Sequence, residues 1–229
     1  METLSIRATG EPLQSPASAP PPGLRRIVLT GFMGAGKSTA GRLLALHLGW
    51  TFLDLDAHLE ARAGATVPEL FRRHGEPGFR RLESSALASA LRQISVVLAL
   101  GGGAPETLTN RLLLEQTPGT LTVFLDAPFP ILFDRCMLQA LNPGAPHPDR
   151  VDQTDTLSPA DPQLRVAPTT PPAPRDADRP NLRDPDAALA RFNLRHPLYR
   201  RLARVTVDTS HLTPAQTAPA ILQAIADLA

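Results

Sequence analysis

A glycine-rich segment near the N-terminus carries the clearest chemical signal in the sequence. Gly31-Phe-Met-Gly-Ala-Gly-Lys37-Ser38 matches the pattern G-x-x-x-x-G-K-[ST] at every fixed position. Its glycines allow backbone N–H groups to point at phosphate oxygens, its lysine reaches the terminal phosphates, and its serine hydroxyl can bind Mg²⁺. A β-branched run precedes it and a helical pattern follows, which disfavours the alternative of a plain strand–helix turn. The motif predicts nucleoside triphosphate binding through Gly34, Ala35, Gly36, Lys37, Ser38 and Thr39.

Two aspartates, Asp54 and Asp56, come at the end of the next strand-like run. In an extended segment residues two apart point the same way, so both carboxylates are expected in the crevice at the carboxyl end of the strand. One can support Mg²⁺ through water, and the other can accept hydroxyl groups of a substrate. The alternative is that either aspartate simply caps the following helix.

The segments that must position these residues alternate between strand and helix patterns. We predict strands at 27–30, 51–55, 94–100, 121–125 and 205–207, and helices at 38–48, 57–62, 67–74, 78–91, 128–141, 186–203 and 214–228. Pro197 is expected to break or kink the helix at 186–203. This alternation predicts an α/β fold built on a parallel sheet.

Composition excludes several classes of function. Apolar residues make up 42% of the 229, enough for a packed core, while the net charge of +1 and 4% aromatic residues argue against nucleic acid or an acidic membrane as partners. The single cysteine, Cys136, excludes an internal disulfide and a cysteine-based zinc cluster. No apolar run approaches the length of a membrane span and the N-terminus has no secretory pattern, so we expect a cytoplasmic protein.

Proline is concentrated in two stretches. Of the 25 prolines, five lie in residues 1–24 and nine in residues 142–178, and both stretches contain few large apolar residues. Such segments bury too little surface to offset the entropy lost on ordering. We therefore predict a disordered tail at 1–24 and one folded domain at 25–229, interrupted by a flexible insertion at about 142–178.

A series of motifs then points to one family. In chain order they read GFMGAGKSTAGRLLA, FLDLDAHLE, FRRHGEPGFRRLE, LALGGGA, RHPLYRRLA and VTVDT, and this series resembles shikimate kinase. The resemblance implies a P-loop fold like that of nucleoside monophosphate kinases, with a five-stranded parallel sheet and a mobile lid. It also implies Mg²⁺- and ATP-dependent phosphorylation of the 3-hydroxyl of shikimate, in aromatic amino acid biosynthesis. We expect a monomer with shikimate and ATP as its small-molecule partners.

The resemblance also assigns roles on the acceptor side. It makes Asp54, with Ser38, the metal-side pair, and it makes Asp56 the shikimate ligand and the base for the attacking hydroxyl. Lys37 is catalytic in the same scheme. Shikimate is expected to contact Arg80, Gly102 and Arg195, with Glu83 one helical turn after Arg80 to hold its guanidinium. A single arginine is otherwise more often a solvated surface charge, and Gly101–Gly103 could be an ordinary turn.

On the nucleotide side, the resemblance assigns Arg135 and Pro214 to the adenine region. Arg179, followed by Pro-Asn-Leu, matches the lid arginine that acts on the phosphates, with Arg165 and Arg175 as competitors. Two positions depart from the family pattern: Pro105 replaces an aliphatic residue, and Leu212 stands where a polar residue is common.

Two rival functions come from different classes. One is a related small-molecule kinase such as a gluconate kinase, against which the two arginines and the triple glycine argue. The other is a degenerate nucleotide-binding regulator, which would be expected to have lost one of Lys37, Asp56, Arg80 or Arg195. None of these residues is lost.

Overall fold

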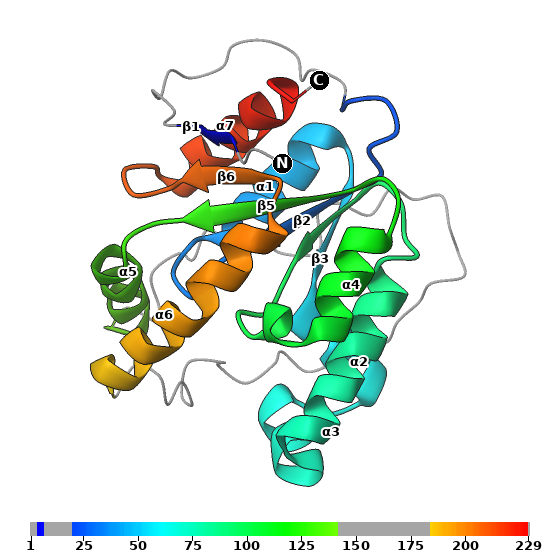
Figure 1. Ribbon diagram of the computed structural model, residues 1–229, viewed down its shortest axis with the longest axis vertical. Helices are drawn as coiled ribbons and strands as arrows, with labels where there is room; N and C mark the ends of the chain where they lie inside the picture. Colours follow the sequence, from blue (N-terminus) through cyan, green and yellow to red (C-terminus); the bar gives the residue numbers. More distant parts are fainter. Residues whose placement is uncertain (1–3, 7–19, 142–183, 229) are drawn as a thin grey trace.

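The computed structural model describes residues 4–6, 20–141 and 184–228 of the chain. These residues form one parallel sheet with strand order β1-β6-β5-β2-β4-β3 (Figure 1). The strands are β1 Leu4–Ile6, β2 Arg26–Thr30, β3 Thr51–Asp54, β4 Val96–Ala99, β5 Thr120–Asp126 and β6 Val205–Asp208. The five strands predicted from the sequence are all present. The sixth, β1, adds three residues to the edge beside β6, within the stretch for which no structure was expected.

The central strands are apolar because helices cover both faces of the sheet. Every residue of β2 and β4 is buried, which explains their near-continuous apolar sequences. Successive residues of β2 belong to different cores: Ile27 and Leu29 pack into one cluster and Val28 into the other. This alternation is the two-residue period of a strand that contributes to both faces.

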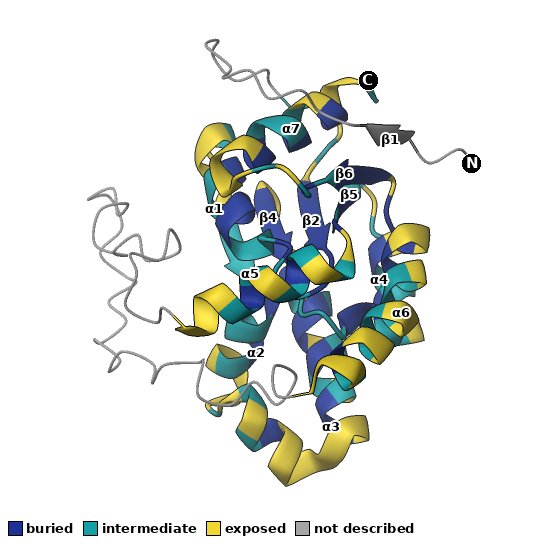
Figure 2. Cartoon of the chain, turned by 90° about the vertical axis from the view of Figure 1, so that its left-hand side faces the viewer, coloured by how far each residue is buried: buried dark blue, intermediate teal, exposed yellow. Residues whose placement is uncertain are grey.

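The helices form two outer layers. They are α1 Lys37–Leu48, α2 Leu55–Ala63, α3 Val67–Ala90, α4 Leu108–Gln116, α5 Phe129–Leu141, α6 Pro185–Leu202 and α7 Pro214–Ala226. Helices α1 and α7 pack together on one side of the sheet, and α4 and α6 cover the other (Figure 2). The P-loop, residues 31–38, follows the carboxyl end of β2 and leads into α1.

Three local features differ from the sequence-based expectation. The predicted helices at 67–74 and 78–91 are one long element, α3, interrupted at Gly75, where φ is 62° and ψ is 178°. Helix α6 continues through Pro197, so of the expected break or kink the break does not occur. Helix α4 and the preceding 3-10 turn, η1 Ala104–Glu106, were not predicted.

The two proline-rich stretches are largely outside this description. The predicted insertion at 142–178 lies entirely outside the described residues, as does most of the predicted tail. Within the described part of the chain, no helix combines the length and apolar character needed to cross a membrane.

Candidate active site

The glycine-rich loop connects β2 to α1, in the strand–loop–helix context that the motif predicts. Gly36 precedes α1 with a φ of 80°, in the left-handed region that favours glycine. Gly34, at φ 76°, lies so close to α5 that a side chain would clash with the carbonyl oxygen of Leu132, and its Cβ would be 3.0 Å from Sγ of Cys136. The loop backbone therefore rests directly on α5.

Lys37 folds back over its own loop. Its Nζ donates hydrogen bonds to the carbonyl oxygens of Gly31 and Phe32, each at 2.9 Å. Ala35 and Thr39 are buried beside it. The residues predicted to hold phosphate thus surround the N-terminus of α1, where the backbone N–H groups of the first helical turn and the helix dipole favour an anion.

Asp54 has two roles at once. It ends β3 and caps α2, its Oδ1 accepting hydrogen bonds from the backbone N–H groups of Asp56 at 3.1 Å and Ala57 at 3.2 Å. Its Oδ2 accepts a hydrogen bond from the Ser38 hydroxyl at 3.1 Å. The capping alternative is therefore realised, and the same carboxylate still faces the P-loop serine that was predicted to share a metal with it.

Asp56 is positioned differently from the sequence-based expectation. Helix α2 begins at Leu55, so Asp56 lies in its first turn and the premise of an extended segment is wrong. Burial raises the pKa of Asp56 to about 7, with smaller contributions from Asp54 and Glu83, while Lys37 opposes the rise. The pKa of Asp56 therefore depends on a charged group of the P-loop, Lys37, and on one of α3, Glu83.

The triple-glycine turn 101–103 follows β4 and is where three elements meet. A Cβ on the first glycine would lie 2.7 Å from Oδ1 of Asp56, on α2. A Cβ on the second would lie 3.5 Å from Nη1 of Arg195, on α6, and one on the third 2.8 Å from Arg80, on α3. Each glycine therefore leaves room for one residue predicted on the acceptor side. The turn brings these residues together, although they are far apart in the sequence.

Arg80 is held as predicted by Glu83. Nη1 of Arg80 lies 3.1 Å from Oε2 of Glu83, whose side chain is only 2% exposed. Burial would lower the pKa of Arg80, but Glu83 and two further carboxylates raise it overall, so the guanidinium stays charged. Burial also raises the pKa of Glu83, and Arg80 opposes that rise. The pair orients the guanidinium towards the glycine turn.

Arg195 brings in two residues that sequence reasoning missed. Its Nε donates a hydrogen bond of 2.6 Å to Oε1 of Glu106, in η1. One turn further along α6, the hydroxyl of Tyr199 donates a 2.6 Å hydrogen bond to the carbonyl oxygen of Gly102. Tyr199 is fully buried, and this burial raises the pKa of its hydroxyl, which therefore stays protonated and able to donate. The available sequence signals were an acidic residue three positions after Gly103 and, for Tyr199, its place as the single tyrosine of the chain.

Arg135 lies where α5 meets the loop after β6. Its Nη2 donates hydrogen bonds to the carbonyl oxygens of Thr209 at 2.6 Å and Ser210 at 3.2 Å. Pro214 is exposed at the first turn of α7, after the capping residue Thr213. The two residues predicted for the adenine region therefore flank one loop, at 208–213.

Leu212 in this loop packs against the main hydrophobic cluster, which explains why an apolar residue stands there. Arg179, predicted as the lid arginine, and its competitors Arg165 and Arg175 lie outside the described residues.

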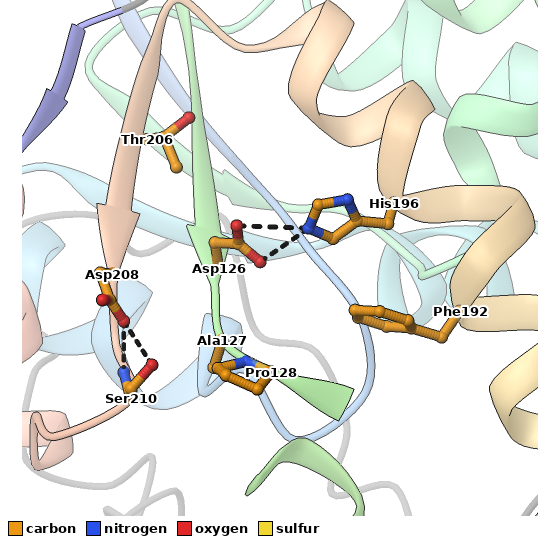
Figure 3. A pocket seen from close by; sticks show the side chains of 8 residues that line it. All are labelled: Asp126, Ala127, Pro128, Phe192, His196, Thr206, Asp208 and Ser210. Atoms are coloured by element: carbon orange, nitrogen blue, oxygen red, sulfur yellow. Dashed lines mark hydrogen bonds and ion pairs between the residues drawn. The ribbon is translucent and has the colours of Figure 1, made fainter. Parts of the chain in front are cut away.

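A cavity of about 370 Å³ lies between the carboxyl ends of β5 and β6 and helix α6 (Figure 3). In Figure 3, His196 points at Asp126, with Nε2 lying 3.0 Å from Oδ1. None of the predicted site residues lines this cavity, so it is distinct from the glycine turn. The His196–Asp126 contact nevertheless ties α6 to β5 at the residue next to Arg195, and so helps to place that arginine.

The geometry described above has close parallels among known proteins. A family model for shikimate kinase matches residues 33–161. The shikimate kinase of Pseudomonas entomophila (strain L48) is 36% identical over 208 residues, which cover 90% of this chain and 98% of the relative. That of Pseudomonas syringae pv. tomato is 35% identical over the same length, with the same shares covered.

Solved structures point to the same family as the sequence comparisons. A shikimate kinase from Acinetobacter baumannii, in complex with shikimate, is similar with a TM-score of 0.66 and 32% identity, over 90% of this chain and 94% of that one. A gluconokinase from Sinorhizobium meliloti 1021 has a TM-score of 0.50 and 19% identity, over 91% and 94% of the two chains, which is a likeness of fold alone. From the length of the sequence match and the site that the fold assembles, the chain belongs to the shikimate kinase family.

Proposed function

We propose that this protein transfers the γ-phosphoryl group of ATP to the 3-hydroxyl of shikimate, giving shikimate 3-phosphate and ADP for aromatic amino acid biosynthesis. The observation that carries the proposal is the glycine turn 101–103, where the space that side chains would fill is bordered by Asp56, Arg80 and Arg195. A carboxylate acceptor and two guanidinium groups around one open backbone turn suit a small polyhydroxylated acid. The P-loop is proposed to bind ATP, the phosphoryl donor.

In the proposed reaction, Asp56 accepts the proton of the attacking hydroxyl. The hydroxyl oxygen forms a bond to the γ-phosphorus as the bond from that phosphorus to the bridging oxygen of ADP breaks. A carboxyl group with a pKa of about 7 is well matched to this task, because it is substantially deprotonated at neutral pH and still basic enough to take a proton. Lys37 neutralises charge on the phosphates.

The substrate's carboxylate is proposed to bind Arg80 and Arg195. Planar guanidinium groups recognise a carboxylate through paired hydrogen bonds, and partial burial strengthens such bonds. Each of these side chains is only 17% exposed. Gly102 would contact the substrate through its backbone, since it has no side chain to hold the ring away.

We also propose that Ser38 and Asp54 hold Mg²⁺. Both offer the hard oxygen ligands that this ion prefers, and they already face one another across 3.1 Å. Mg²⁺ usually takes only one or two protein ligands beside phosphates and water, so these two residues fit it. When bound, the ion would neutralise negative charge on the nucleotide's phosphates.

For the nucleotide, we propose that Arg135 and Pro214 border the adenine and that Arg179 reaches the phosphates. The support for Arg179 is the resemblance of residues 179–182 to the family's lid motif. Arg179→Ala is expected to lower kcat sharply, whereas Arg165→Ala and Arg175→Ala should leave it within about twofold, because neither is assigned a role at the phosphates. A silent Arg179→Ala together with a damaging Arg165→Ala or Arg175→Ala would show that the motif has been misaligned. The expected monomer and its cytoplasmic location stay predictions.

The decisive experiment is a coupled assay of ADP release with shikimate, with gluconate and with no acceptor. We expect release to depend on shikimate and to be no faster with gluconate than without an acceptor. Lys37→Met serves as the inactive control, with a loss of kcat on the order of 10³-fold or more. Equal or greater stimulation by gluconate would overturn the assigned acceptor, and acceptor-independent release alone would favour a nucleotide-binding regulator.

A further inference from the structure

A third carboxylate lies between the two arginines at the glycine turn. Oε1 of Glu106 accepts the 2.6 Å hydrogen bond from Nε of Arg195 and lies 3.8 Å from Nη2 of Arg80. One oxygen atom thus contacts both guanidinium groups that are proposed to bind the substrate's carboxylate. Glu83 holds Arg80 from the other side. The Glu106 carboxylate therefore occupies the position in which an anionic ligand would interact with both arginines.

The backbone that carries Glu106 is firmly anchored. Nη1 of Arg111 donates hydrogen bonds to the carbonyl oxygens of Pro105 at 2.6 Å and Glu106 at 2.9 Å. Asn110, which is fully buried, donates a 2.9 Å hydrogen bond to the carbonyl oxygen of Ala104. With η1 fixed in this way, rotation of its own side chain is the simplest way for the Glu106 carboxylate to leave the arginines. That side chain is 27% exposed, which leaves room for rotation into solvent.

We propose that Glu106 is an internal substitute for the substrate's carboxylate. It keeps Arg80 and Arg195 together in the empty site, and the incoming carboxylate displaces it. This inference rests on the proposed function, because it takes the same two arginines as the substrate's binding groups. Exchanging one carboxylate for another leaves the local charge unchanged. Glu83 and Glu76 stay beside Arg80, and the incoming carboxylate replaces Glu106 beside Arg195, so neither arginine is left without a counter-charge.

Displacement makes Glu106 a specificity-determining residue. An acceptor that carries a carboxylate can replace the interactions that Glu106 gives up, whereas an uncharged analogue cannot. The enzyme would then discriminate against neutral acceptors beyond what direct contacts provide. The cost is that anionic substrate binds more weakly than it would to an unoccupied arginine pair, since only the fraction of molecules with Glu106 displaced is competent.

The test is Glu106→Gln, which keeps the shape of the side chain and removes its charge. Binding of shikimate and of its neutral methyl ester is measured by calorimetry, and kcat and KM are measured for shikimate. We expect the Kd and KM for shikimate to fall about three- to tenfold, with kcat and the KM for ATP within about twofold of the original. The Kd for the methyl ester should change less than that for shikimate. Glu115→Gln, an exposed change of the same charge on α4, is the matched control and should alter none of these.

The opposite result is equally clear. If Glu106 serves only to hold the arginines in place while substrate is bound, Glu106→Gln will raise the Kd for shikimate, and that result or an unchanged Kd overturns the inference. Should Glu106→Gln fail to fold, Glu106→Asp provides a second test with the same expected direction, because it draws the carboxylate back by one methylene group from Arg195 while keeping its charge. If the unmodified protein neither binds nor phosphorylates shikimate, both proposals are overturned. A shikimate-active protein whose Glu106→Gln variant binds no tighter overturns only this one.

Discussion

The carboxylate of Asp56 lies against Gly101, so closely that a Cβ at that glycine would stand 2.7 Å from Oδ1. This closeness brings the first turn of α2 to the residues that follow β4. No glycine-specific backbone angle is involved at this position, because Gly101 is not among the positive-φ residues. What the site needs from Gly101 is the absence of a side chain.

Gly101→Ala should therefore displace the proposed base without unfolding the protein. Because a displacement on the order of 1 Å in a reacting group can cost up to about 100-fold in rate, we expect kcat to fall by about ten- to 100-fold. The comparison variant is Gly102→Ala, whose Cβ would lie at an ordinary 3.5 Å from Arg195 and should act chiefly on the KM for shikimate. Steady-state kinetics of the two variants distinguish these effects, and a Gly101→Ala enzyme with unchanged kcat would contradict the assigned role of Asp56.

The activity should depend on the ionisation of Asp56. Burial, followed by Asp54 and Glu83, raises its pKa to about 7, and a base must be deprotonated to act. We expect kcat/KM for shikimate to increase with pH through about 7 and then level off. Asp56→Asn should lower kcat by on the order of 10²-fold or more, a typical contribution of a general base, and abolish this rise while leaving the binding of ATP largely intact. A pH profile that is flat between 6 and 8 in the unmodified enzyme would count against Asp56 as the base.

The raised pKa of Asp56 also predicts that the folded state becomes less stable as pH rises. The folded protein keeps a proton on Asp56 up to about pH 7, whereas the unfolded chain loses it near the ordinary pKa of an aspartate, 3.8. The folded state therefore binds more protons between these values, so this group's stabilisation is present below the unfolded pKa and lost as pH rises to about 7. Asp56→Asn, which carries no charge, should raise Tm by several degrees at pH 8 and by almost nothing near pH 4.

Solvent at this partly exposed carboxylate will reduce the size of that effect but not its sign. Thermal unfolding without nucleotide or metal, at a series of pH values, provides the measurement. Glu115→Gln controls for the general loss of one negative charge. A Tm difference between Asp56→Asn and the unmodified protein that shrinks as pH rises would mean that the pKa is lowered rather than raised.

Arg80→Lys and Arg195→Lys should each weaken the binding of shikimate more than the binding of ATP. Lysine keeps the charge but loses the planar pair of donors, and one charge-assisted hydrogen bond is worth about 1–3 kcal/mol, or roughly five- to 150-fold in affinity. Arg81→Lys is the matched control, since Arg81 is exposed on the same helix as Arg80. KM values for both substrates decide the matter. Equal losses for shikimate and ATP would argue against a carboxylate-binding pair.

Local sequence was enough to predict the elements whose character is set within a few residues. The apolar runs that became β2 and β4, the glycine loop before α1 and the pairing of Arg80 with Glu83 three residues later all belong to this group. In each of them the physical cause lies inside one strand, one turn or one helical turn. One local prediction was wrong: Asp54 and Asp56 do not lie in the same extended segment. Asp54 caps α2 and so ends the extended segment before Asp56.

Contacts between distant segments could not be predicted in this way. Glu106 meets Arg195 across 89 positions of sequence, and Tyr199 meets Gly102 across 97. Their importance comes from the packing of α6 over the glycine turn, which no local pattern reports. Helix α4 was missed for a related reason: it is short, and its exposed Leu108 and Leu112 blur the amphipathic pattern that a buried face would give.

The absence of a side chain at Gly34 places the phosphate loop directly on top of the chain's single thiol. Sγ of Cys136 is buried beneath that loop, at 3.0 Å from where a Cβ of Gly34 would be. Because the loop covers this sulfur, we expect a reagent that alkylates thiols to reach it when the loop and α5 separate. The rate of alkylation at Cys136 should then report on opening of the nucleotide site, and a nucleotide that holds the loop in place should slow it. With one cysteine in 229 residues, the labelled position is unambiguous and no engineered probe is needed.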